Sequence, residues 1–169
     1  MNILFHTLNW YKGEIFEASV ILVFGLLLII LAVIFWQVGS SPYSQAMVIP
    51  LVVAGAIFVL SSGYGLWKNQ RLMVQLEQKL PEDEEQFVKA EKKRVEGFQY
   101  LYDFTKYLAT GFFAIAILIF FFTENRHWQA AAIAMVILGL SGLVIDYFSK
   151  ERADIYYQII MNYENGEQL

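Results

Sequence analysis

Three carboxylates near the ends of long apolar segments are the residues best suited to chemistry. Glu14 and Glu17 are three residues apart, so a helix places both carboxylates on one face, where they could hold a hard cation or share a proton. Asp146 lies in another apolar segment. Counting from Trp36 and Trp128 at about 1.5 Å per residue puts Glu17 and Asp146 at a common depth of about 27–28 Å. These carboxylates are therefore candidates for one common site.

Further ionisable residues fall at or just below this depth, close to the inner edge of a hydrocarbon core about 30 Å thick. Together they form a candidate charge ring, which consists of Glu14, Glu17, Lys68, Asp103, Lys106, Asp146 and Lys150. The functional interpretation of the ring is a site for a cation, a proton or a metal. We favour the structural interpretation, a belt of interfacial ion pairs, because charges this near the boundary reach the headgroups at low cost.

Metal and catalytic chemistry would need further groups. The chain has no cysteine, and its two histidines, His6 and His127, do not complete the Glu-x-x-His pattern of di-iron helix bundles. Gly63-Tyr64-Gly65 matches the filter tripeptide of potassium channels but lies at the inner end of an apolar segment. Catalytic sets, phosphate loops and cofactor motifs are lacking. We expect no catalytic residue, cofactor or metal.

The elements that position the charge ring are four apolar segments. The chain is 57% hydrophobic with a mean hydropathy of +0.46, whereas soluble domains average about 45–50% apolar residues. The apolar segments cover residues 15–36, 46–66, 107–122 and 128–148, and three of them are close to the about 20 residues that span a membrane as a helix. We predict an all-α integral membrane protein, a single membrane domain over residues 1–169 built as a four-transmembrane-helix antiparallel bundle.

A charged segment over residues 67–106 separates the two pairs of spans. We predict that the second span continues as a helix until Pro81, after which the acidic residues 82–85 begin a new helix. This second helix has favourable Glu85–Lys89 and Glu91–Arg94 spacings, and we expect its charges to face solvent. Residues 149–164 continue a helical stripe beyond the last span. These two regions form the predicted cytoplasmic helical extension.

The N-terminal residues 1–10 also have an apolar stripe at helical spacing. We predict that this segment lies along the membrane surface and that Lys12-Gly13 turns the chain into the first span.

Charge placement predicts the orientation of the spans. Every Lys and Arg except Arg126 lies in the central segment, in the tails or next to them. The positive-inside rule therefore places both termini and the central segment in the cytoplasm. We expect the protein to lie in a bacterial inner (plasma) membrane.

Small residues within the spans predict close helix packing. Gly55 and Gly63 lie in the second span, and Gly139 and Gly142 lie in the fourth. The residues around Gln45 and those around Gln129 also match at constant offset, either through duplication or through the shared composition of apolar helices.

The leading functional hypothesis is non-enzymatic. A small membrane protein without a catalytic set, but with a charged helical extension, fits an accessory or interaction protein, and its topology alone is similar to that of small four-span immunity proteins. The alternative is a homo-oligomeric cation channel or carrier subunit that uses the charge ring. A membrane enzyme or metal site with Glu14, Glu17 and Asp146 comes third. We expect the lipid bilayer and a protein partner or self-association, and no nucleic acid, as the interaction partners.

Overall fold

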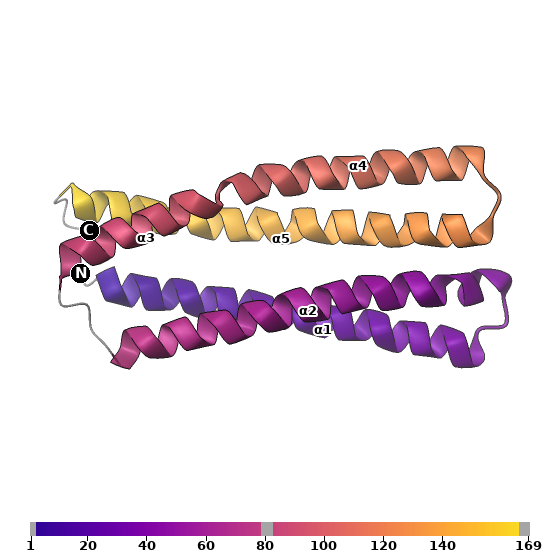
Figure 1. Cartoon of the computed structure of the whole chain (residues 1–169), viewed down its shortest axis with the longest axis horizontal. Coiled ribbons are helices and arrows are strands. Elements are labelled where there is room, and N and C mark those ends of the chain that lie inside the picture. The colour runs from indigo at the N-terminus through magenta and orange to yellow at the C-terminus, as the bar shows by residue number, and fades with distance from the viewer. Residues whose placement is uncertain (1–2, 79–82, 166–169) are drawn as a thin grey trace.

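The protein is all-helical over the residues that its computed structural model describes, 3–78 and 83–165 (Figure 1). Four of its helical stretches are long and apolar enough to cross a membrane, which agrees with the predicted spans by length and composition. The helices in chain order are α1 (Ile3–Val38), α2 (Pro42–Gln78), α3 (Glu84–Phe98), α4 (Tyr100–Phe122) and α5 (Arg126–Glu164).

The long helices form two hairpins, α1–α2 and α4–α5, whose turns lie at the same end of the molecule (Figure 1). A glutamine side chain closes each turn. Nε2 of Gln45 donates to the carbonyl oxygen of Gly39 at 2.7 Å, and Nε2 of Gln129 donates to that of Thr123 at 3.0 Å. The two residues that match at constant offset in the sequence thus satisfy otherwise unpaired carbonyls in the same way.

Two glycines bring α1 and α2 into backbone contact. A Cβ atom added to Gly55 would lie 2.7 Å from the Gly25 carbonyl oxygen, and one added to Gly25 would lie 2.9 Å from the Gly55 carbonyl oxygen. Neither position tolerates a side chain without a shift of the backbone. The predicted close packing is confirmed at Gly55, whereas an added Cβ at Gly63 would have no atom within 4 Å.

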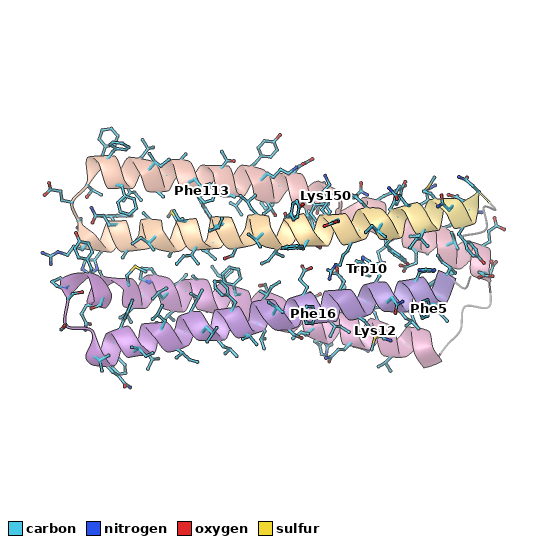
Figure 2. All side chains as sticks on the ribbon, turned by 180° about the vertical axis from the view of Figure 1, so that it is seen from behind. Phe5, Trp10, Lys12, Phe16, Phe113 and Lys150 are labelled. Atoms are coloured by element: carbon cyan, nitrogen blue, oxygen red, sulfur yellow. The ribbon has the colours of Figure 1, made fainter. Side chains whose placement is uncertain are left out.

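The α4–α5 hairpin packs an aromatic ring over a glycine. A Cβ added to Gly139 would lie 3.1 Å from Cε1 of Phe113, which Figure 2 shows between the two helices. One at Gly142 would lie 3.3 Å from Cγ2 of Thr105. The prediction that the glycines of the fourth span allow close approach of a neighbouring helix is therefore confirmed.

Helix α5 joins the two hairpins. An apolar core of Leu28, Leu51 and Phe58 from α1 and α2 packs against Ile137 and Ile145 of α5. Within the described part of the chain, α4 packs against α5 and the end of α3 but has no extensive contact with α1 or α2. Figure 1 accordingly shows α5 between α4 and the α1–α2 hairpin. The bundle thus consists of three mutually packed helices, α1, α2 and α5, with α4 outermost against α5, rather than a closed square.

At the end opposite the turns, three helical segments form a second packed unit, which we call the terminal bundle. It consists of residues 3–12 of α1, all of α3, and residues 152–164 of α5. Its buried apolar core contains Ile3, Val88, Val95, Tyr156 and Ile160. Both ends of the described chain therefore lie in this unit.

The predicted turn at Lys12-Gly13 is wrong, because α1 runs through both residues without interruption. The stripe of the N-terminal segment packs within the protein instead: Ile3, Thr7 and Tyr11 are buried. At about 1.5 Å per residue, the 36 residues of α1 extend about 54 Å, well beyond an about 30 Å core.

The predicted helix beyond the second span is confirmed, since α2 extends to Gln78. We call residues 67–78 the α2 arm; this arm has no extensive contact with α3 among the described residues. Pro81 lies outside the described residues. Asp83 caps α3 by accepting a hydrogen bond from the Gln86 backbone amide at 3.1 Å, so the new helix begins in the predicted region.

Candidate functional site: a charged cavity between the hairpins

A cavity of about 630 Å³ lies where the two hairpins meet the terminal bundle. All five helices contribute to its wall. Its carboxylates come from α1 and α5, whereas its basic side chains come from α2 and α3. These ionisable residues are Glu14, Glu17, Asp146, Lys68, Lys93 and Arg94.

Arg152 of α5 holds the two carboxylates of α1. Its Nη2 atom donates to Glu14 Oε1 at 2.6 Å and to Glu17 Oε2 at 2.5 Å. The three side chains are between 19% and 32% exposed, so the ion pairs are partly shielded from water and stronger than surface pairs. Glu14 and Glu17 do share one face, as predicted, but an arginine from the other hairpin occupies that face.

Asp146 lacks such a partner. Thr105 is within hydrogen-bond reach of its carboxyl group, but the buried Oδ2 atom has no hydrogen-bond partner among the described residues. No ion pair of Asp146 occurs in the described part of the chain. The carboxylate therefore borders the cavity with unused acceptor capacity.

The remaining members of the predicted charge ring lie on the outer side of α4 and α5. Asp103 and Lys106 pair with each other at 3.0 Å on the exposed surface of α4. A separate groove of about 710 Å³ is lined by Lys106, Asp146 and Lys150, among others. Of the seven ring residues, Asp146 therefore lines both the inner cavity and the outer groove, five others line one of the two, and Asp103 lines neither.

A polar network crosses the core of the terminal bundle and joins its three helices. The Tyr156 hydroxyl on α5 lies 2.7 Å from the Thr7 hydroxyl on α1 and donates to Glu91 Oε2 on α3 at 2.9 Å. Arg94 also donates to Glu91, and its guanidinium lies 4.3 Å from the ring centroid of Trp10. Figure 2 shows Trp10 in the space between α1 and α5.

This network corrects one expectation and confirms another. The charges of α3 do not all face solvent, because Glu91 is only 7% exposed and faces α1 and α5. The predicted local pairs form: Glu91 with Arg94, and Glu85 with Lys89 on the exposed surface.

Burial determines the titration of the central tyrosine. Desolvation raises the pKa of Tyr156 above its ordinary value of 10.0, and the nearby Glu91 carboxylate raises it further. The phenol therefore stays neutral and able to donate its proton in the Glu91 hydrogen bond.

An ion pair and a hydrogen bond outside the core also connect helices of the terminal bundle. Lys92 of α3 pairs with Glu164 of α5 at 2.6 Å, and the Tyr157 hydroxyl donates to Glu96 at 2.8 Å. Both contacts join α3 to the last turns of α5. They hold the terminal bundle at its solvent-exposed edge, where each contributes little on its own.

Sequence reasoning missed Arg152, although the signal was present. The count of residues from Trp128 to Arg152 nearly equals the count from Trp36 to Glu14, which places both side chains at a common depth. Among the described residues, no cluster of three or more His, Cys, Asp or Glu side chains could hold a metal ion. The charged side chains that line the cavity can bind polar groups by charge and hydrogen bonds.

Comparison with protein-family models, with curated proteins and with solved structures yields no match.

Proposed function

We propose that the protein is a non-enzymatic accessory or interaction protein that spans a bacterial inner (plasma) membrane with α1, α2, α4 and α5. The terminal bundle and the α2 arm lie in the cytoplasm in this proposal. Length and composition of the four helices support insertion, and the placement of Lys and Arg supports the orientation.

The observation that supports the proposal most directly is that Arg152 binds both Glu14 and Glu17. A conduction pathway needs carboxylates that exchange partners with a passing cation, whereas these two are held by a side chain of the same protein. The Arg152 contacts instead hold α1 against α5 next to the terminal bundle. A fixed arrangement of these helices supports the role of a protein that binds or stabilises a partner.

A partner protein can contact this chain at either of two surfaces. Within the membrane, α4 offers a long lipid-facing surface with exposed Phe120, Phe121 and Phe122. Beyond the membrane, the α2 arm exposes apolar residues such as Trp67 and Val74. A photoreactive amino acid at Val74, with Phe121 as the comparison position, distinguishes an arm contact from a lateral contact in native membranes.

The decisive experiment measures the assembly state of the purified protein in lipid nanodiscs and cation flux in liposomes made from the same preparation. We expect a non-conducting monomer or dimer. A closed ring that conducts cations would overturn the accessory role and establish the channel alternative.

One observation favours the alternative of a cation channel or carrier subunit, namely the unpaired Asp146 carboxylate beside the cavity. Toward the turns, however, the interface of α1, α2 and α5 is an apolar core that includes Leu51 and Phe58. A polar path would therefore require several copies of the chain. D146N should abolish flux if the channel alternative holds, while D103N, on the outer surface, should not.

A metal-dependent membrane enzyme remains the third candidate. Its proposed ligands Glu14 and Glu17 are engaged by Arg152, so a metal would have to displace the guanidinium. Elemental analysis of protein purified without chelator tests this candidate directly, and a stoichiometric metal would revive it.

A further inference from the structure

We propose that the cavity between the hairpins binds the zwitterionic headgroup of an aminophospholipid of the phosphatidylethanolamine class. The primary ammonium lies toward Asp146, and the phosphate lies toward Lys68 and Lys93. This inference rests on the membrane insertion that we propose above, and it adds a specific lipid partner.

Charge balance in the cavity favours a zwitterion. Three carboxylates and three basic side chains line it, so its formal charge is zero. Two of these carboxylates share Arg152, and Arg94 is paired with Glu91. The unpaired groups are Asp146 on one side and the two lysines on the other, and neither lysine has an ion pair among the described residues. A zwitterion can pair with both sides, whereas a ligand of one sign can pair with only one.

The unpaired acidic and basic side chains of the cavity lie on different helices. Asp146 lies on α5, whereas Lys68 lies on α2 and Lys93 on α3. A ligand that satisfies both sides must carry both a cationic and an anionic group, which a phosphoethanolamine headgroup does. Lysine ammonium groups are suitable partners for its phosphate.

Asp146 selects a primary ammonium over a quaternary one. Its Oδ2 atom has no hydrogen-bond partner among the described residues, and the residue lines the cavity. A primary ammonium supplies three N–H donors, whereas a choline group supplies none.

The surroundings favour a lipid over a free headgroup. Leu101 of α4 and Ile145 of α5 also line the cavity, so its wall combines charge with apolar surface. The α2 and α4 helices have no extensive contact with each other in the described structure. Acyl chains can therefore leave the site along lipid-facing helices while the headgroup stays at the membrane boundary.

The test is native mass spectrometry of the purified full chain after equilibration in detergent micelles that contain equal amounts of phosphatidylethanolamine, phosphatidylcholine and phosphatidylglycerol. We expect phosphatidylethanolamine to be retained about tenfold more than phosphatidylcholine. This ratio corresponds to the binding free energy that one charge-assisted hydrogen bond contributes. Equal retention of the three lipids, or preference for phosphatidylglycerol, would overturn the proposal. Soluble glycerophosphoethanolamine should compete only weakly; competition as strong as by the lipid would refute a lipid site.

Variants locate the site. D146N should bring retention of phosphatidylethanolamine down to that of phosphatidylcholine, and the K68Q/K93Q double variant should lower retention of both. D103N, whose carboxylate pairs with Lys106 on the outer surface, is the matched control and should retain the preference. An unchanged preference in D146N would exclude this cavity, with thermal unfolding measured in parallel to show that each variant is folded.

This readout is independent of the accessory role, because it uses no partner protein and no flux. A conducting ring that retains phosphatidylethanolamine would overturn the proposed function and leave the lipid site in place. A non-conducting monomer without lipid preference would overturn the lipid site and leave the proposed function in place.

Discussion

The guanidinium of Arg152 lies 2.5 Å from the carboxylate of Glu17, so one ion pair ties α5 to α1 where the terminal bundle meets the long helices. The same nitrogen reaches Glu14 at 2.6 Å. One arginine thus pairs with two partly buried carboxylates from a different hairpin. Because α1 and α5 belong to different hairpins, this contact adds to the apolar core of α1, α2 and α5 in holding the two halves of the molecule together.

Removing the arginine should therefore cost more than removing either carboxylate. R152Q leaves two like charges close together and partly buried, and we expect a loss of about 2 kcal/mol in the free energy of unfolding, below the value for fully buried pairs because water reaches the site. E14Q and E17Q should each cost less, since one ion pair remains. The measurement is denaturant unfolding in detergent micelles, followed by circular dichroism.

The control for this prediction is K150Q, which removes an exposed base two residues away in the sequence. It should change stability by less than about 0.5 kcal/mol. Adding E17Q to R152Q should recover part of the loss, because the double variant leaves one carboxylate instead of two. If R152Q and K150Q unfold alike, Arg152 does not hold the hairpins together.

Tyr156 should make the terminal bundle sensitive to alkali. Burial raises the pKa of its hydroxyl in the folded state above the ordinary value of 10.0. The unfolded chain therefore loses this proton at lower pH than the folded chain, so stability is full below about pH 10 and falls as pH rises above it. Y156F should flatten this decline and should cost about 1–2 kcal/mol at neutral pH, because Glu91 loses a hydrogen bond.

The comparison variant is Y147F, since Tyr147 is 69% exposed. The measurement is the thermal unfolding temperature of both variants and of the unmodified protein at a series of pH values. A decline with pH that is the same in Y156F as in the unmodified protein would show that other groups control the alkaline behaviour.

Local sequence patterns predicted much of the fold. The apolar segments lie within four long helices. The pairs Glu85–Lys89 and Glu91–Arg94 formed because residues three or four apart on a helix are neighbours regardless of tertiary structure. Small residues predicted close packing at Gly55, where a neighbouring backbone must approach. Each of these inferences depends on one helix alone.

Contacts between distant helices were harder to predict. Counting residues along a helix gives the depth of a side chain but not the direction in which it points, so the charge ring included Asp103, which faces outward, and omitted Arg152. The stripe of α1 containing Ile3 fits either a membrane surface or a packed bundle, because both require one apolar face. The partner that decides between them, the far end of α5, lies almost the whole chain away.

The contact between Gly25 and Gly55 gives a stability prediction with an internal control. G55A would place Cβ 2.7 Å from the Gly25 carbonyl oxygen, so α1 and α2 must separate, at a cost of about 1–3 kcal/mol. G63A meets nothing within 4 Å and should be neutral or should stabilise by up to about 1 kcal/mol through helix propensity. Equal unfolding of the two variants would contradict the close contact at Gly55.

Single-cysteine labelling tests the proposed topology, and the chain suits it because it contains no cysteine of its own. Ser40 and Glu124 are exposed in the two hairpin turns, and Gln86 is exposed on α3. If the positive-inside distribution sets the orientation, a membrane-impermeant maleimide should label S40C and E124C in intact spheroplasts, whereas Q86C should react only after permeabilisation. Labelling of Q86C alone would mean that the orientation is reversed. Labelling of only one turn would mean that one hairpin does not cross the membrane, and the lipid site between the hairpins would then lose its basis as well.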